Sequence, residues 1–214
     1  MSARDTVLGN IRAALGRDAP LSESERQRLR RRDAEHARST QPQVDDDLIA
    51  AMKAGMQRVQ MGCEEIADVA AAPGAVLAFA ERHQLPASAV IAPALAALDW
   101  PAALAVRSGA AGRDDQLGVS ACLCAVAETG SIVLASAADS PTTLNFLPEN
   151  HIVVLRRSQV LRHLEDVWPL LRELGLPPRA VNLNTGPSRT ADIEQTIEIG
   201  AHGPRRMHVL LAAE

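Results

Sequence analysis

Short apolar segments alternate with segments of helical periodicity from about residue 59 onward, and this alternation constrains the fold more than any other feature of the chain. Strands are predicted at residues 89–92, 104–106, 131–135, 151–155, 180–183 and 207–211, and helices at 73–83 and 160–171. Residues 119–126 fit either a buried strand or a helix. Strands that alternate with helices favour an α/β fold with a mostly parallel sheet flanked by helices.

The first 60 residues are predicted to form a separate helical extension, which leaves residues 61–214 for the α/β domain. Four apolar residues near the start fall at roughly helical spacing: Val7, Leu8, Ile11 and Leu15. Ser22 and Glu25 have the spacing of a capping box before an arginine-rich segment with almost no apolar stripe. We expect that segment to be solvated or bound to a partner.

Charge and aromatic content argue against nucleic-acid binding. The chain has 22 basic and 26 acidic residues, a net charge of −4 and a sequence pI near 5.9, so a dominant phosphate-backbone contact is not expected. Aromatic residues make up only 2% of the chain, which provides few platforms for base stacking. No stretch approaches the ~20 apolar residues of a membrane span, and no signal-peptide pattern follows Met1. We expect a cytoplasmic protein without a membrane span.

The cysteines indicate a reducing compartment and no cofactor in this chain. Cys63, Cys122 and Cys124 are odd in number and form no CxxC pair, so a four-cysteine iron–sulfur site cannot be built from this chain alone. If residues 119–126 form a strand, Cys122 and Cys124 lie on the same side of it as buried, inert thiols.

Polar loops that leave strands are the candidate binding segments, because ligands of open α/β sheets sit beyond the carboxyl ends of the strands. Four loops rich in polar, glycine and proline residues were identified on this basis: 128–130, 147–151, 185–192 and 200–206.

The loop at 185–192 is predicted to be a glycine turn followed by the start of a helix. Ser188 or Thr190 would be the N-cap, with Asp192 in the first turn. The free amide groups and the guanidinium of Arg189 could hold a phosphate or a carboxylate. The more common alternative is an ordinary capped helix in which Arg189 bridges to an acidic neighbour.

Glu128 follows a buried apolar run, at a turn between two predicted strands. A carboxylate in that position would have a raised pKa unless it is paired, which could make it an acid, a base or a nucleophile. It could equally be a structural acceptor for neighbouring backbone amides, and this second role is slightly favoured.

His151 and His202 lie in proline-containing loops at predicted strand edges. Two histidines and a carboxylate could form a metal site, but their spacing matches no compact ligand pattern. A loop histidine bonded to the backbone is the commoner case, and no metal site is predicted.

Four blocks of sequence stand in order in the second half of the chain: AETGSIVL at 127–134, LPENHIVV at 147–154, GPSRTADIE at 186–194, and GAHGP with MHVLL at 200–211. Together these blocks resemble the LUD-domain family, and within it the lactate utilization protein C branch. The resemblance is strong over residues 118–214 and weak over the first hundred.

This resemblance implies a fold similar to the sugar-phosphate isomerase and CoA-transferase-like α/β class. It also implies a place in a three-component bacterial system that oxidises L-lactate to pyruvate, whose companion subunits resemble cysteine-rich and ferredoxin-type iron–sulfur proteins. Related folds use a glutamate in a strand-exit turn as a nucleophile toward CoA thioesters. Glu128 has a similar setting, but Thr129 and Gly130 directly after it depart from the transferase signature.

We therefore expect a non-cluster subunit of an iron–sulfur system oxidising L-lactate, which binds a small carboxylate or other anion. The expected catalytic residues are Glu128, His151 and His202, and the expected ligand-binding residues are Thr129, Gly130, Gly186, Ser188, Arg189, Thr190, Asp192 and Gly203. Arg189 would bind the lactate carboxylate, and His151 or His202 would take the hydroxyl proton.

Two other hypotheses remain open. The chain could be a freestanding transferase or isomerase acting on a CoA thioester, a folate or a sugar phosphate, which rests on fold analogy. Alternatively, the N-terminal helices could be the docking arm of an interaction protein.

Overall fold

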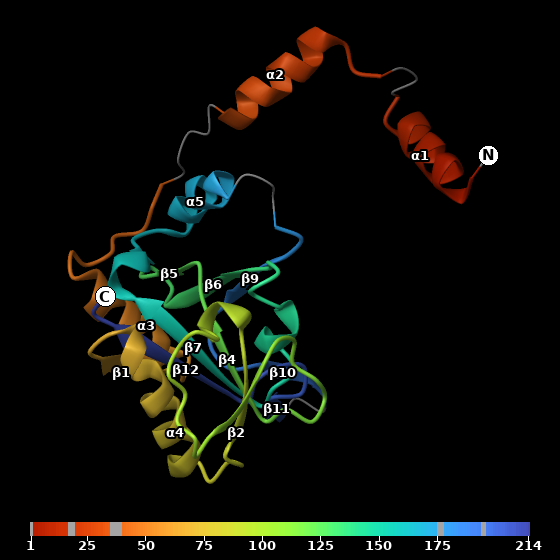
Figure 1. Ribbon diagram of the computed structural model, residues 1–214. Coiled ribbons are helices and arrows are strands. Elements are labelled where there is room, and N and C mark those ends of the chain that lie inside the picture. The colour runs from red at the N-terminus through yellow and green to blue at the C-terminus, as the bar shows by residue number, and fades with distance from the viewer. Residues whose placement is uncertain (1, 17–19, 35–39, 175–177, 194–195) are drawn as a thin grey trace. The chain divides into compact units, whose positions relative to one another are not determined.

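A computed structural model describes residues 2–16, 20–34, 40–174, 178–193 and 196–214 (Figure 1). The chain forms two compact units, residues 1–41 and 42–214, which are described separately. Among the described residues, no helix combines the length and the hydrophobicity that crossing a membrane requires.

The N-terminal unit contains helices α1 (Ala3–Ala14) and α2 (Glu23–Ala34). In α1, Ser2 and Asp5 form a capping box, because the Ser2 hydroxyl accepts from the Asp5 amide and the Asp5 carboxylate accepts from the Ser2 amide. The predicted box before α2 is also present: the amide of Ser22 donates to Glu25 Oε2 at 2.9 Å, and the amide of Glu25 donates to Ser22 Oγ at 3.3 Å. No residue of α1 is buried.

The larger unit is built around a six-stranded sheet in which every strand pair is parallel, so the predicted α/β class with a mostly parallel sheet is confirmed. In spatial order the strands are β1 (Gly62–Ile66), β12 (Arg206–Ala212), β7 (Asn150–Arg156), β4 (Leu117–Ala121), β2 (Ser88–Ile91) and β3 (Ala105–Ser108). The first of these, β1, was not predicted.

Alternate residues of the central strands fill cores on opposite faces of this sheet. Ile152, Val154 and Leu210 pack against α4 (Ala72–Arg82). Val153 and Val209 pack against α3 (Leu48–Arg58) and a second sheet. The strands therefore carry continuous apolar runs, as expected of a parallel sheet covered on both faces.

Helix α3 belongs to the larger unit, although the sequence placed it in the N-terminal extension. Met52 and Met56 are fully buried in the core beneath it. Its N-cap is Asp47, whose side chain accepts from the Ala50 amide. The compact α/β unit therefore begins at Pro42 rather than at residue 61.

The second sheet has four strands in the order β8 (Val160–Leu161), β5 (Cys124–Val126), β6 (Ser131–Ala135) and β9 (Val181–Asn184). Helix α5 (Val167–Glu173) covers it, with Val167 in the same core cluster as Val133. The predicted helix at 160–171 is therefore shorter than expected, because its first part joins this sheet as β8.

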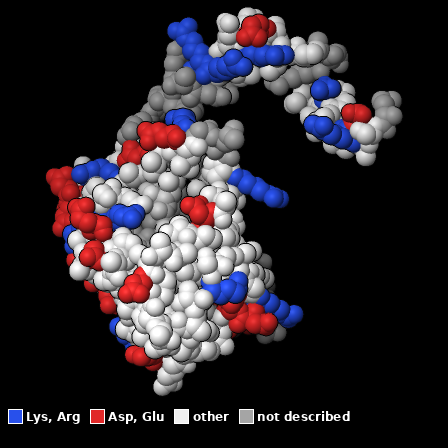
Figure 2. Space-filling model, viewed as in Figure 1, with Lys and Arg blue, Asp and Glu red and all other residues white. Residues whose placement is uncertain are grey.

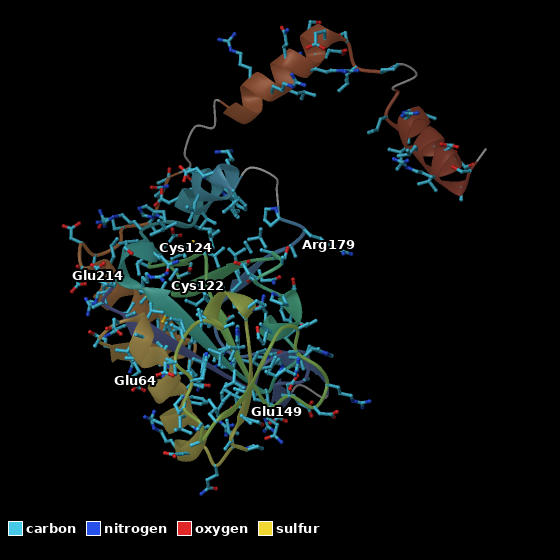
Figure 3. The ribbon with its side chains drawn as sticks, viewed as in Figure 1. Glu64, Cys122, Cys124, Glu149, Arg179 and Glu214 are labelled. Carbon is cyan, nitrogen blue, oxygen red and sulfur yellow. The ribbon has the colours of Figure 1, made fainter. Side chains whose placement is uncertain are left out.

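Residues 119–126 form the end of β4 and all of β5 rather than one element. Cys122 lies between the two strands and packs in the core cluster that α3 covers. Cys124 packs in the other core cluster, which α5 covers. The expectation that both cysteines lie on one side of a strand is therefore wrong. Both cysteines, which are labelled in Figure 3, have free and buried thiols. Burial raises the pKa of Cys122 and raises the pKa of Cys124 to about 11.

The helix predicted to start near residue 190 is also wrong, since the segment forms a two-stranded antiparallel sheet of β10 (Arg189–Ile193) and β11 (Thr196–Ile199). Four β-branched residues favour strands here: Thr190, Ile193, Thr196 and Ile199. Short 3₁₀ helices complete the chain at Val69–Ala71, Pro93–Leu95, Thr142–Asn145, Arg157–Gln159 and Leu164–Asp166.

Candidate functional site: a basic cavity at the amino edge of the sheet

A cavity of about 200 Å³ lies where β1 and β12 begin. Helix α4 runs back along the sheet from the end of β1, so its C-cap residue His83 reaches this same edge. The loops before β10 and before β12 supply the rest of the wall. The lining residues are Gln60, Gly62, Phe79, His83, Pro187, Ile199, Arg205, Arg206, Met207 and His208.

Two arginines and two imidazoles meet at this cavity, and among the residues that the structure describes no acidic side chain lines it. Arg206 is oriented by Asn150, whose Oδ1 accepts from Arg206 Nη1 at 3.2 Å. The stem of Arg205 packs over Gly200, where φ is +88° and a β-carbon would overlap the arginine. The backbone amides of both arginines donate to the carbonyl oxygen of Glu149, which is labelled in Figure 3. Their side chains therefore start from a fixed backbone.

His208 faces the α4 side of the sheet, and its ring lies 5.2 Å from that of Phe79. Its Nε2 atom is buried without a hydrogen-bond partner, 3.5 Å from Oε2 of Glu64 on β1. Burial lowers the pKa of His208, and the Glu64 carboxylate opposes that effect. Glu64 is also 3.6 Å from Arg82 on α4.

His83 also packs beside the Phe79 ring, with the ring centroids 4.3 Å apart. Burial lowers the pKa of His83, and the positive charges of Arg206 and Arg82 lower it further. At neutral pH the arginines are therefore the permanent positive charges of the cavity, and both imidazoles favour the uncharged form.

Three of the expected ligand-binding residues, Gly186, Ser188 and Arg189, lie in the loop before β10 or at the start of that strand, next to the cavity. Gly186 has φ +95° and approaches Val59 so closely that a β-carbon would lie 2.8 Å from its carbonyl oxygen. Arg189 donates to that same oxygen at 3.2 Å and to Gln60 Oε1 at 2.7 Å. The guanidinium of Arg189 therefore holds the loop against the α3–β1 turn and is not among the residues that line the cavity.

Ser188 and Gly203 connect the two loops of the cavity. The Ser188 amide donates to the Pro204 carbonyl, and the Gly200 amide donates to the Ser188 carbonyl, both at 2.9 Å. A β-carbon at Gly203 would lie 3.2 Å from Cβ of Ser188. These contacts fix the spacing between the loops.

Thr129 and Gly130 are joined to the same region through a row of hydroxyls. Thr129 Oγ1 and Ser131 Oγ lie 2.6 Å apart, and Ser131 Oγ lies 2.6 Å from Thr185 Oγ1, just before Gly186. Gly130 has φ +70° and packs directly on the backbone of α3. Ser131 was not predicted, and Thr185 was predicted only as part of the loop at 185–192, because isolated hydroxyls far apart in sequence give no pattern.

Glu128 does not line the cavity. Its Oε2 atom accepts from the Leu164 amide at 3.2 Å and lies 3.2 Å from Nδ1 of His163. These contacts are those of a structural acceptor, and a catalytic role of Glu128 stays a prediction.

His151 lies inside the sheet, with Nε2 2.7 Å from Ser120 Oγ and with Nδ1 buried and unpartnered. Burial alone lowers its pKa to about 4. It does not line the cavity, and His202 is exposed on the loop before β12. None of the four residues of the expected centre, Glu128, His151, Arg189 and His202, lines the cavity, and each of the first three has its own protein partners. Their catalytic and binding roles stay predictions.

Two remaining expectations concern β10. Thr190 pairs with Glu198 of β11, and the side chain of Asp192 is outside the described residues. The loop at 147–151 leads into β7, and the loop at 200–206 leads from β11 of the small sheet into β12, which places the cavity at the amino edge of the six-stranded sheet. Among the residues that the structure describes, no group of three potential metal ligands occurs.

Comparison with known proteins adds a family to this geometry. A family model described as the LUD domain matches residues 106–212. The chain is 29% identical to lactate utilization protein C of Geobacillus kaustophilus over 54% of this chain and 50% of that protein, so the match spans about half of that relative. It is 27% identical to protein YkgG of Escherichia coli over 95% of each chain.

The fold also matches a solved structure. A crystal structure of a DUF162 family protein from Deinococcus radiodurans superposes with a TM-score of 0.56 and 21% sequence identity, over 80% of this chain and 100% of that one. That likeness concerns the fold alone.

Proposed function

The chain belongs to the LUD-domain family, and on that premise we propose that it is a non-cluster subunit of a bacterial iron–sulfur system that oxidises L-lactate to pyruvate. Several relatives bear the name lactate utilization protein C, and these names support a role in lactate utilization. In this proposal the chain binds a small carboxylate in the cavity at the start of β1 and β12.

One observation carries the choice of ligand: Arg205 and Arg206 converge with His83 and His208 on a cavity that no carboxylate of the described part of the chain lines. A cavity of about 200 Å³ suits a small organic acid, and arginine is the preferred partner of a carboxylate. Lactate and pyruvate are both small monocarboxylates.

The iron–sulfur clusters are assigned in this proposal to cysteine-rich and ferredoxin-type partner subunits. Cluster ligands are thiolates. Burial raises the pKa of all three cysteines of this chain, which disfavours the thiolate form, and Cys122 and Cys124 lie in separate apolar cores.

Titration calorimetry of the full chain with L-lactate and pyruvate tests the ligand. We expect binding by the unaltered protein and a loss of about tenfold or more in affinity for Arg206→Gln, because a charge-assisted hydrogen bond is removed. Arg179→Gln is the matched control, since this labelled arginine is exposed and outside the cavity (Figure 3). Binding of CoA or sugar phosphates, with no binding of either monocarboxylate, would favour the transferase or isomerase instead.

The N-terminal unit is assigned in the same proposal as the arm that docks a partner subunit. The two units differ in the sign of their net charge. Residues 1–41 are net positive, with nine arginines and six acidic residues, whereas residues 42–214 are net negative, with thirteen basic and twenty acidic residues. Figure 2 shows the basic side chains gathered along α2. Helix α1 adds four exposed apolar side chains: Val7, Leu8, Ile11 and Leu15. An unpartnered apolar stripe of this kind suits a helix that binds another protein.

Co-purification tests the arm. A Leu8→Asp, Ile11→Asp variant should lose the partner subunits while its α/β unit keeps its thermal midpoint, because α1 buries no residue. Asn10→Asp, which adds a charge among exposed residues of the same helix, is the control. Retention of the partners by the double variant would contradict the docking role.

A further inference from the structure

We propose that the cavity takes up its anion together with one proton, and that His208 is the proton acceptor. The ligand class is a small monoanion that is bound beside an imidazolium. This inference rests on the proposed function for the location of the ligand but not for its identity as lactate.

The first argument is the state of Nε2 on His208. A buried polar nitrogen without a hydrogen-bond partner is costly, and here it stands 3.5 Å from a carboxylate oxygen of Glu64. A second proton on the ring makes both nitrogens donors, so Nε2 then carries a hydrogen toward Glu64 whichever tautomer was present before. Glu64 is thus placed to stabilise the charged ring.

The second argument concerns the groups around His208 that disfavour a positive charge on its ring when no anion is bound. From α4, Arg82 and His83 face His208 and disfavour a further positive charge, and the Phe79 ring excludes water from one side of it. From β1, Glu64 favours the charge. At the start of β12, Arg206 acts on His83 in the same sense as Arg82. An anion in the cavity adds a negative charge among these groups and reverses the balance.

The coupling has a defined sign. Burial lowers the pKa of His208 in the empty cavity, and the bound anion raises it. Binding therefore tightens as the pH falls through the raised value and levels off below the lowered one. Between the two values the affinity changes by up to tenfold per pH unit, because one proton is exchanged.

The geometry of the strand pair supports the assignment to His208 rather than to a surface group. Gly62 and His208 are partners in the register of β1 and β12, and both line the cavity. A β-carbon at Gly62 would overlap Nδ1 of His208. Because glycine has no side chain, residue 62 leaves room for the His208 ring beside the cavity.

Calorimetry of the full chain between pH 5.5 and 8, in pairs of buffers with different ionisation enthalpies, measures the proton directly. The probes are L-lactate and nitrate, two monoanions that do not titrate in this range. We expect proton uptake on binding, its loss in His208→Asn with a flat pH dependence of affinity, and its retention in Arg179→Gln. A thermal midpoint recorded for each variant shows that it is folded.

The outcomes separate the two proposals. Lactate binding without proton uptake, or uptake that persists in His208→Asn, overturns the coupling and leaves the proposed function standing. Nitrate binding with uptake that depends on His208, but no lactate binding, upholds the coupling and overturns the lactate function. Binding of neither anion at any pH overturns both.

Discussion

Gly62 on β1 and His208 on β12 stand opposite each other in a parallel register, and the absence of a side chain at residue 62 is what leaves room for the imidazole. The pair lies where the two strands begin, beside Arg206 and Pro187 of the neighbouring loops. A glycine at the edge of a sheet therefore helps to create the ligand space, because close approach of a ring to a strand needs a residue without Cβ.

Gly62→Ala should displace the His208 ring and weaken carboxylate binding. The new methyl group overlaps Nδ1, so we expect a loss of about 1–3 kcal/mol in the free energy of unfolding, as for other overpacked sites. Chemical denaturation and calorimetry measure the two effects. Gly74→Ala in α4 is the control, since nothing lies within 4 Å of the added carbon and alanine stabilises a helix by about 0.5–1 kcal/mol. Equal stability of both variants would contradict this account.

Gly130→Ala should be the more damaging glycine substitution. Gly130 has φ +70°, and its β-carbon would lie 2.5 Å from the Met56 amide nitrogen and 2.6 Å from the Gly55 carbonyl carbon. Backbone cannot move aside as a side chain can, so α3 would have to shift from its core. We expect a lower thermal midpoint than for Gly62→Ala. A midpoint equal to that of the unaltered protein would show that α3 does not pack on this turn.

Glu128→Ala should reduce stability, because it leaves the Leu164 amide and His163 without their acceptor. The expected loss is about 1–3 kcal/mol in the free energy of unfolding. Glu128→Gln keeps an acceptor oxygen and should lose less. Urea denaturation of the two variants makes the comparison. If Glu128 is instead a nucleophile, Glu128→Gln will leave stability unaltered and abolish turnover in the assembled system.

His151 predicts acid destabilisation. Its folded-state pKa is lowered to about 4, against about 6.5 in an unfolded chain, so the unfolded state binds an extra proton between those values. Above pH 6.5 the free energy of unfolding is unaffected by this group. As the pH falls below 6.5, the free energy of unfolding declines by about 1.4 kcal/mol per pH unit, and the total loss is about 3 kcal/mol near pH 4. His151→Asn should show a shallower slope in denaturation curves across this range, and an unchanged slope would contradict the assignment.

The strands that were predicted from the sequence are those with continuous apolar runs, such as β7 and β12, since a buried parallel strand needs apolar residues on both faces. Strand β1 lacks that pattern, because at the edge of the sheet Glu64 and Glu65 are tolerated. The segment after Ser188 was misassigned to a helix because capping residues also occur in turns.

The candidate site was only partly predictable, for a different reason. The loops at 185–192 and 200–206 were identified as binding segments, and both contribute lining residues to the cavity. His208 was missed because a single histidine inside MHVLL reads as part of a strand. Its exposure to the cavity depends on Gly62, which is 146 positions earlier in the chain. Pairings of this kind are set by the register of two strands and leave no local signal.

The central claim is that a small carboxylate binds where β1 and β12 begin, and a crystal structure of the full chain grown with L-lactate tests it most directly. The account predicts density for the carboxylate within hydrogen-bonding distance of the Arg206 guanidinium, with the rest of the molecule against His208. Lactate found only beside Glu128 or His151, with the cavity holding nothing but water, would contradict it.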